Sequence, residues 1–144
     1  MATSDAPLQV GRVVLTVNDL GKVGDFYQDT IGLQHLSGDA AGMVLGADGA
    51  PLLELRRDAA ARFRPQEAGL FHTAFPLPDR RALGSWLRRI AETQTSLDGA
   101  SDHLVSEAIY LSDPEGNGIE IYADRPHEAW NFRPDGTVEM DTRR

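Results

Sequence analysis

The chain has 144 residues, no cysteine and a formal net charge of −8 at pH 7. This length suits one compact domain with its own core. The negative charge disfavours nucleic acid or anionic lipid as a partner, because both are polyanions. Without cysteine the chain has no disulfide, thiolate catalyst or zinc–thiolate site, which leaves His, Asp and Glu as possible metal ligands.

No apolar run approaches the roughly 20 residues that cross a bilayer. Residues 1–7 are small and polar and lack the charged and apolar parts of a signal peptide, so we expect a disordered leader there. These features predict a cytoplasmic protein with no membrane partner and with a small molecule as its ligand.

The first predicted elements are a strand over residues 8–17 and a helix that follows it. Asn18 or Asp19 suits the N-cap of this helix, and Gly32 suits its end. Apolar residues at helical spacing predict the face that packs on a sheet. This stripe consists of Leu20, Val23, Phe26, Tyr27 and Ile31.

Short strands are predicted between Leu33 and Arg56, with breaks at residues 37–39 and 46–49. In the last strand, alternation turns Leu53 and Leu55 into the core and Glu54 to the opposite face. Residues 58–69 are charged, rich in alanine and contain a proline. We therefore expect a connector there, with room for a short helix.

The second half of the chain begins a new series at Leu70, where apolar side chains alternate and His72 falls on the non-core side. Residues 83–90 have the spacing of an amphipathic helix. Further strands are expected near residues 96–98 and 105–111. Residues 125–144 carry prolines and aromatic residues that suit a tail wrapping over the domain.

Residues 109–122 predict a β-hairpin, because two apolar runs flank the turn sequence Asp-Pro-Glu-Gly-Asn-Gly. Strand alternation places Tyr110, Glu120 and Tyr122 on one face. The opposite, apolar face consists of Ile109, Leu111, Ile119 and Ile121. A carboxylate and two phenols on the first face are costly to bury unless something binds them.

The chain is a tandem duplication. Residues 45–55 align with residues 111–121, so that Glu54 falls on Glu120, and residues 12–20 align with residues 72–80, so that Arg12 falls on His72. Each copy contains a strand, a helix and then three strands. The fold is therefore predicted to be α+β, with two tandem βαβββ modules at about residues 8–57 and 70–124 in a single domain over residues 8–124.

These features resemble the vicinal-oxygen-chelate superfamily of glyoxalases, extradiol dioxygenases and bleomycin-resistance proteins. His103, then Ile109-Tyr110, Asp113-Pro114, Gly116 and Glu120 are similar to the signature of extradiol ring-cleavage dioxygenases. Ser101 departs from that signature. Residues 99–108, residues 120–126 and Trp130 resemble the amino-terminal half of two-domain bacterial catechol 2,3-dioxygenases, which implies either a stand-alone relative or a fragment.

The resemblance implies that the paired modules form a cupped mixed sheet with the helices on its outer face, and that a metal binds inside the cup. The corresponding positions here are Arg12, Glu54, His72 and Glu120. Arg12 stands where the family has a histidine, and a guanidinium cannot ligate a metal because it has no acceptor. The implied ligands are then His72, Glu120 and Glu54. Fe(II) is the implied metal, with Mn, Ni or Zn as alternatives, and no metal is expected if Arg12 closes the site by a salt bridge with Glu54 or Glu120.

The resemblance also implies catalytic roles for Tyr110, as a hydrogen-bond partner of a bound catecholate, and for His103 in proton transfer. The alternatives are a packed strand tyrosine and a solvated loop histidine beside Asp102. His35 and His127 are expected to be surface residues.

Three functions remain open. The first is extradiol cleavage of an aromatic ring with Fe(II) and dioxygen. The second is a glyoxalase-type lyase or isomerase, in which a glutamate moves the proton. The third is a non-catalytic module that binds a small molecule, which the arginine at position 12 favours. The expected partners are a small aromatic or vicinal-oxygen substrate and, as in the family, a second copy of the chain in a homodimer.

Overall fold

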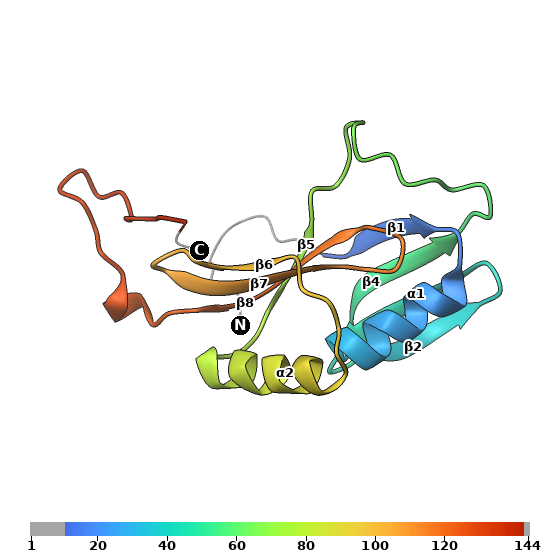
Figure 1. Ribbon diagram of the computed structural model, residues 1–144, viewed down its shortest axis with the longest axis horizontal. Coiled ribbons are helices and arrows are strands. Elements are labelled where there is room, and N and C mark those ends of the chain that lie inside the picture. The colour runs from blue at the N-terminus through green and yellow to red at the C-terminus, as the bar shows by residue number, and fades with distance from the viewer. Residues whose placement is uncertain (1–10, 143–144) are drawn as a thin grey trace. The chain divides into compact units, whose positions relative to one another are not determined.

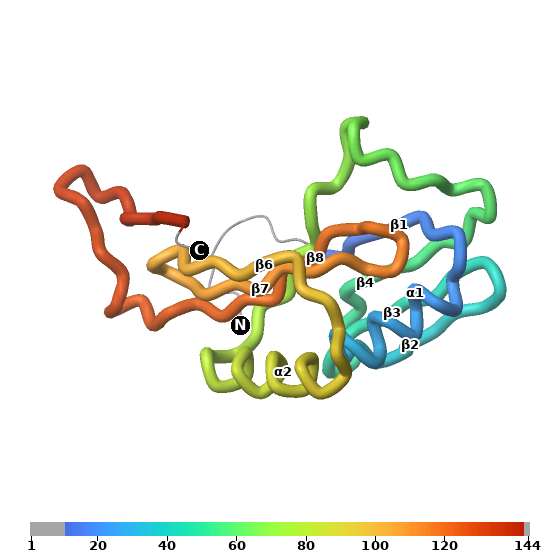
Figure 2. The backbone as a smooth tube through the Cα atoms, in the orientation of Figure 1, coloured from blue at the N-terminus to red at the C-terminus, as the bar shows by residue number. Residues whose placement is uncertain are grey.

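The computed structural model describes residues 11–142 and divides the chain into two compact units. The N-terminal unit comprises residues 11–71 and the loop Asp113–Asn117, and the C-terminal unit comprises residues 72–112 and 118–142. The predicted leader and the start of the predicted first strand lie outside the described residues. Figure 1 shows the elements of each unit, and Figure 2 follows the chain through them.

The N-terminal unit is a four-stranded mixed sheet with the order β1-β4-β3-β2 and one helical segment. Strands β1 and β4 are parallel, while β4, β3 and β2 are antiparallel neighbours. Helix α1 packs on β3 and β4 (Figure 1). The elements are β1 (Val13–Val17), α1 (Leu20–Phe26), the π-helical turn η1 (Tyr27–Ile31), β2 (Gln34–Asp39), β3 (Gly42–Ala47) and β4 (Ala50–Arg57).

Helix α1 begins and ends as its sequence predicts. The Asp19 side chain accepts a hydrogen bond from the Lys22 amide at 3.0 Å, so Asp19 is the N-cap. Gly32 ends the helical segment in a left-handed conformation with φ of 97°, which glycine adopts without steric cost. The buried core of this unit consists of Leu15, Val17, Leu20, Val23, Tyr27, Leu33, Leu45, Leu53 and Leu55.

The predicted break at residues 37–39 is wrong. These residues belong to β2, and the turn follows at residues 40–41. The Asp39 carboxylate accepts hydrogen bonds from the amides of Ala41 and Gly42 and so stabilises a turn that directly follows the predicted break. The next turn is narrower than predicted: only Asp48 and Gly49 form it, and both have positive φ, as a type I′ hairpin turn requires.

The C-terminal unit repeats the same architecture, with sheet order β5-β8-β7-β6. Strands β5 and β8 are parallel, and the other neighbours are antiparallel. Helix α2 packs on β8 (Figure 1). The elements are β5 (Thr73–Pro76), α2 (Arg80–Glu92), β6 (Gly99–Asp102), β7 (Ser106–Ser112), β8 (Gly118–Asp124) and the short 3-10 turn η2 (His127–Ala129). The predicted α+β class and the two βαβββ modules are thus confirmed.

The predicted alternation of the hairpin is also confirmed. Tyr110 pairs with Glu120 across β7 and β8, and both are partly exposed. Their neighbours on the other face are buried, namely Ile109, Leu111, Ile119 and Ile121. Leu83, Trp86 and Ile90 of α2 are buried as well. In this hairpin the apolar side therefore faces the core of the unit, and the opposite side carries the partly exposed Tyr110 and Glu120.

Two other expectations differ from the structure. The strand expected near residues 96–98 is β6, which begins at Gly99. Residues 93–98 connect the end of α2 at Glu92 to this strand, and Gln94 in the connection has a positive φ of 53°. Residues 58–72, all of which the structure describes, contain turns but neither helix nor strand. Within the described part of the chain, no helix is long and apolar enough to cross a membrane.

The loop Asp113–Asn117 connects β7 to β8 and belongs to the N-terminal unit. Asp113 is 5% exposed, and its carboxylate accepts hydrogen bonds from the amides of Glu115 and Asn117 at 2.8 and 2.9 Å. The Tyr27 hydroxyl donates to the same carboxylate at 3.4 Å. Burial and this neighbouring charge raise the pKa of Tyr27 far above its ordinary value.

Glu115 gives the loop Asp113–Asn117 a second set of contacts. Its carboxylate accepts hydrogen bonds from the amides of Asn18 and Asp19 at 2.8 and 2.7 Å, at the residues that lead into α1. The sequence pattern predicted only turn chemistry for this loop. The structure adds contacts with the helix start and with Tyr27, both within the N-terminal unit.

We predict that Asp113→Ala lowers the free energy of unfolding by about 2–3 kcal/mol, because it leaves buried donors without an acceptor. Denaturant titration of the full chain measures this change. Asp135→Ala is the matched control, since Asp135 accepts a comparable bond from the Thr137 amide at 2.9 Å in an exposed turn. An equal loss in both variants would contradict a structural role specific to Asp113.

Candidate functional site

The non-core face of the C-terminal sheet gathers the predicted site residues of that unit. Tyr110 on β7 lies opposite Glu120 on β8, and Ala74 on β5 lies beside Glu120 in the parallel pairing. His72 directly precedes β5, two positions before Ala74, and therefore has the same parity. His103 follows β6 in the turn that leads to β7.

A continuous line of hydrogen bonds joins these side chains. The Nε2 atom of His72 lies 2.9 Å from Oε2 of Glu120. The hydroxyl of Tyr110 lies 3.1 Å from the other carboxylate oxygen, Oε1, and 2.9 Å from Nε2 of His103. The line His72, Glu120, Tyr110, His103 thus spans β5, β8 and β7 and reaches the β6–β7 turn, and we call it the polar line.

Burial and the electrostatics of the polar line move the ionisation of Tyr110 still further above neutral pH. Burial, the charge of Glu120 and the hydrogen bond to that carboxylate together raise the pKa of Tyr110 to about 12. Tyr122 also has a raised pKa, caused by burial and then by the charges of Asp124 and Glu120. A phenol that remains protonated beside a carboxylate is a hydrogen-bond donor for an anionic oxygen and does not act as a base.

His103 has structural partners that a solvated loop histidine lacks. Its ring is partly buried, with Nε2 against Tyr110 and Nδ1 3.1 Å from the main-chain carbonyl of Asp141. Of the remaining histidines, His35 is exposed on β2. His127 is exposed, and its ring lies tilted against those of Trp130 and Phe132, with ring centroids 4.9 and 5.3 Å apart.

The corresponding face of the N-terminal sheet has different chemistry. Glu54 on β4 forms two ion pairs. Its Oε2 atom lies 2.8 Å from the Arg12 guanidinium, and its Oε1 atom lies 2.6 Å from the Arg56 guanidinium. The hydrogen bond from Arg56, followed by the charge of Arg12, lowers the pKa of Glu54 although burial acts in the opposite direction. The salt bridge between Arg12 and Glu54 that the sequence suggested is therefore present. Both oxygens of Glu54 are already engaged by cations.

The donor chemistry of the polar line fits part of a metal centre. An Fe(II) site of the extradiol type takes two imidazoles and one carboxylate, and leaves positions open for substrate and oxygen. His72 and Glu120 supply one imidazole and one carboxylate. Over residues 11–142 the structure contains no group of three or more His, Cys, Asp or Glu placed to hold a metal ion. The described residues do not complete a three-ligand centre, so the chemistry that we derive for this face involves only protons and hydrogen bonds.

The contacts of three residues were not predicted from the sequence, namely those of Arg56, Glu115 and Asp141. Arg56 carries a signal that alternation offers, since it lies two residues after Glu54 on one strand and so shares its face. Glu115 acts through main-chain amides of a distant helix start. Asp141 acts through a main-chain carbonyl, which every residue possesses, so no sequence pattern indicates it.

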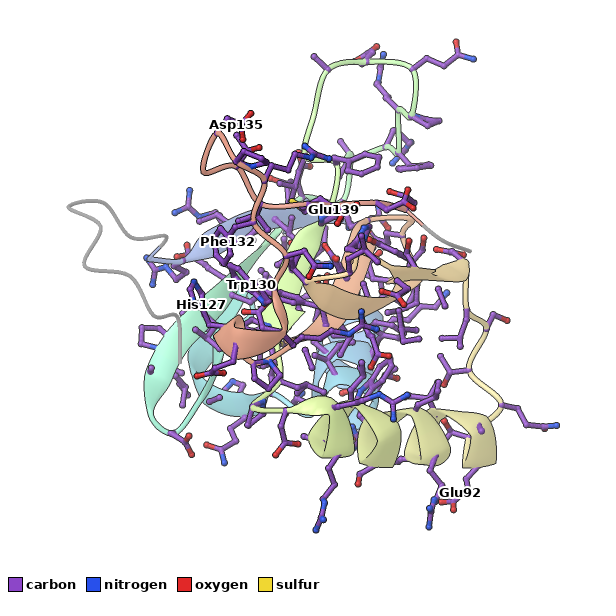
Figure 3. All side chains as sticks on the ribbon, turned by 90° about the vertical axis from the view of Figure 1, so that its left-hand side faces the viewer. Glu92, His127, Trp130, Phe132, Asp135 and Glu139 are labelled. Carbon is purple, nitrogen blue, oxygen red and sulfur yellow. The ribbon has the colours of Figure 1, made fainter. Side chains whose placement is uncertain are left out.

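We predict that Glu120→Gln lowers the pKa of Tyr110 from about 12 toward its ordinary value near 10, since it removes the negative charge that opposes ionisation. Absorbance of the tyrosinate during a pH titration measures the change, and Tyr110→Phe identifies the signal. Glu92→Gln, at the exposed end of α2 (Figure 3), makes the same chemical change away from the polar line. A Tyr110 pKa that is unchanged in Glu120→Gln would contradict the assigned contact.

Comparison with known proteins places this geometry in context. The family described as the Glyoxalase/Bleomycin resistance protein/Dioxygenase superfamily matches residues 9–121. Catechol-2,3-dioxygenase of Bacillus subtilis (strain 168) is 43% identical over 136 residues. That match covers 92% of this chain and 47% of the relative, so the chain spans about half the length of the relative.

Solved structures share the fold at lower identity. A glyoxalase/dioxygenase from Nostoc punctiforme has a TM-score of 0.70 at 20% identity, over 88% of this chain and 99% of that one. Lactoylglutathione lyase from Agrobacterium tumefaciens has a TM-score of 0.65 at 20% identity, over 81% and 94% of the two chains. The two βαβββ units have a glyoxalase-like fold, and the chain belongs to the Glyoxalase/Bleomycin resistance protein/Dioxygenase superfamily.

Proposed function

We propose that the chain is an extradiol-dioxygenase-like protein whose C-terminal unit binds a small aromatic diol on the polar line. The observation that carries this proposal is the hydrogen-bonded series His72, Glu120, Tyr110 and His103 on one open sheet face. The 43% identity with a catechol-2,3-dioxygenase supports the choice of an aromatic diol among small ligands. A homodimer and a cytoplasmic location remain predictions from the sequence.

The polar line has both the acceptors and the donor that a vicinal diol needs. Glu120 is a carboxylate and accepts a hydrogen bond, or the proton itself, from a diol hydroxyl, and His72 at 2.9 Å is positioned to share that proton. Tyr110 stays protonated at neutral pH because its pKa is about 12, so its hydroxyl donates to the oxygen that has lost its proton. When both nitrogens of its ring carry a proton, His103, whose Nε2 lies 2.9 Å from that hydroxyl, can replace the proton that Tyr110 donates.

Ring cleavage would require a metal that His72 and Glu120 hold together with a third ligand. A bound Fe(II) would act as a Lewis acid and as a template for dioxygen. Glu54 was the third ligand expected from the sequence, but within its own unit both of its carboxylate oxygens form ion pairs, with Arg12 and Arg56. We therefore propose extradiol cleavage as the activity of this chain on the condition that a third metal ligand joins His72 and Glu120.

One observation favours a second function, a binding module without catalysis. In the N-terminal unit the guanidinium of Arg12 occupies the sequence position that corresponds to His72 and neutralises Glu54 at 2.8 Å. An internal cation of this kind satisfies the carboxylate without a metal. A glyoxalase-type reaction has no comparable support, because likeness to lactoylglutathione lyase at 20% identity concerns the fold alone.

We predict that the full chain binds catechol more tightly than resorcinol, the isomer whose hydroxyls are not adjacent. Glu120→Gln and Tyr110→Phe should each weaken catechol binding about tenfold or more, since a hydrogen bond to a charged group contributes about 1.5–3 kcal/mol. Isothermal titration measures the affinities, and Glu92→Gln serves as the matched control. Equal affinity for the two isomers, or no effect of both site variants, would contradict the proposed site.

Ring cleavage separates the two candidate functions. The protein is loaded with Fe(II) without oxygen, its metal content is determined, and the ring-opened product is followed after oxygen and catechol are added. Bound iron with ring-opened product that is lost in His72→Ala supports the dioxygenase. Catechol binding without product supports the binding module, and the absence of both contradicts both functions.

A further inference from the structure

The chain after β8 forms an ordered strap that returns to the polar line. Residues 125–142 run outward from β8 and fold back toward the β6–β7 turn (Figures 1 and 2). Near its start, the indole nitrogen of Trp130 donates to the Arg125 carbonyl at 3.0 Å. The two arms of the strap then pair through a bridge between Phe132 and Val138. Two backbone hydrogen bonds at 2.8 Å join them as well, from the Arg133 amide to the Thr137 carbonyl and from the Glu139 amide to the Asn131 carbonyl. Figure 3 shows the side chains of this strap from His127 to Glu139.

The strap ends against His103. The Asp141 carbonyl lies 3.1 Å from Nδ1 of the His103 ring, and the Asp141 amide donates to the His103 carbonyl at 3.4 Å. The turn itself holds His103 from the other side, because the His103 amide donates to the Ser106 carbonyl at 2.9 Å. Leu104 takes a positive φ of 70° in this turn. The ring is therefore fixed between the strap and Tyr110.

The chemistry of the two ring contacts is different. A main-chain carbonyl only accepts hydrogen bonds, so Nδ1 must carry a proton to bond with Asp141. The Tyr110 hydroxyl both donates and accepts, so Nε2 can bond with it in either protonation state. When Nε2 carries a proton, it donates to Tyr110, whose own proton then goes to Glu120 at 3.1 Å. When Nε2 lacks a proton, Tyr110 can donate to His103 instead.

We infer that the main-chain carbonyl of Asp141 fixes the tautomer of neutral His103, with the proton on Nδ1, so that Nε2 faces the Tyr110 hydroxyl as an acceptor and competes with Glu120 for its hydrogen bond. Asp141 is thus a positioning residue that acts through His103. The use of this arrangement in ligand binding or catalysis rests on the function proposed above, whereas the tautomer itself does not.

The charged groups around His103 are compatible with this arrangement. Beyond the polar line, Asp102 precedes His103, but its carboxylate accepts from the Leu104 amide at 2.8 Å and pairs with Arg125 at 3.0 Å. The Asp141 carboxylate accepts from the Thr142 amide at 2.8 Å. The Asp141 carbonyl lies within hydrogen-bond distance of Nδ1, at 3.1 Å.

Nitrogen NMR of the full chain with labelled histidine tests the inference, since the two tautomers give different shifts for Nδ1 and Nε2. At a pH where the imidazoles are neutral, His103 should show the Nδ1–H form, while exposed His35 serves as the internal reference. In Tyr110→Phe the Nδ1–H form should persist, because the Asp141 carbonyl remains. A His103 that shows the Nε2–H form, or that loses the Nδ1–H form in Tyr110→Phe, would overturn the inference.

A second variant weakens the strap contact itself. Asp141→Pro removes the amide that bonds to the His103 carbonyl, and it should raise the fraction of the Nε2–H form at His103. Asp135→Ala, at the exposed turn of the strap, should leave that fraction unchanged. An unchanged tautomer in Asp141→Pro, with His103 still in the Nδ1–H form, would show that another group fixes the ring. None of these results depends on catechol, so failure of the inference and failure of the proposed function are distinguishable.

Discussion

The cross-strand pairing of Tyr110 with Glu120 is the contact on which the rest of the site depends. The register of β7 on β8 places the two side chains opposite each other, and sliding one strand by one residue would turn its polar side chain into the core and bring its isoleucine to the other face. The buried apolar partners on the other side make that shift very unfavourable. The core therefore fixes the face on which the polar side chains stand, and from Glu120 the contacts extend to His72 and from Tyr110 to His103.

The two units show how a duplicated fold can carry different chemistry at matching positions. Both have the same strand order and the same helix against the sheet. At the matching positions, however, the C-terminal unit pairs a glutamate with His72, which can give and take a proton or bind a metal, whereas the N-terminal unit pairs a glutamate with Arg12, which stays charged. The fold alone therefore does not determine function, and each face must be assessed by its own residues.

Much of the fold was predictable because periodicity and turn chemistry act locally. The Asp19 cap, the Gly32 end and the alternation along β7 and β8 all follow from short patterns and are confirmed. The start of β6 was not predicted correctly, because it depends on the length of the connection between α2 and β6.

The site was predictable only in part, for a similar reason. Parity groups Tyr110 with Glu120, but it cannot show that His103 lies against Tyr110 from a neighbouring turn. Nor can it find Asp141, whose contribution is a main-chain carbonyl at the far end of the strap. Long-range contacts through the backbone have no residue signature, and they need coordinates.

The central claim is that Tyr110 and Glu120 act as one bonded unit toward a ligand. A double-mutant cycle of catechol affinity tests it most directly, with Tyr110→Phe, Glu120→Gln and the double variant compared with the original chain. Coupled residues should give an interaction energy of about 0.5–3 kcal/mol. Additive effects of the two substitutions would contradict the claim, because the residues would then contact the ligand independently or not at all.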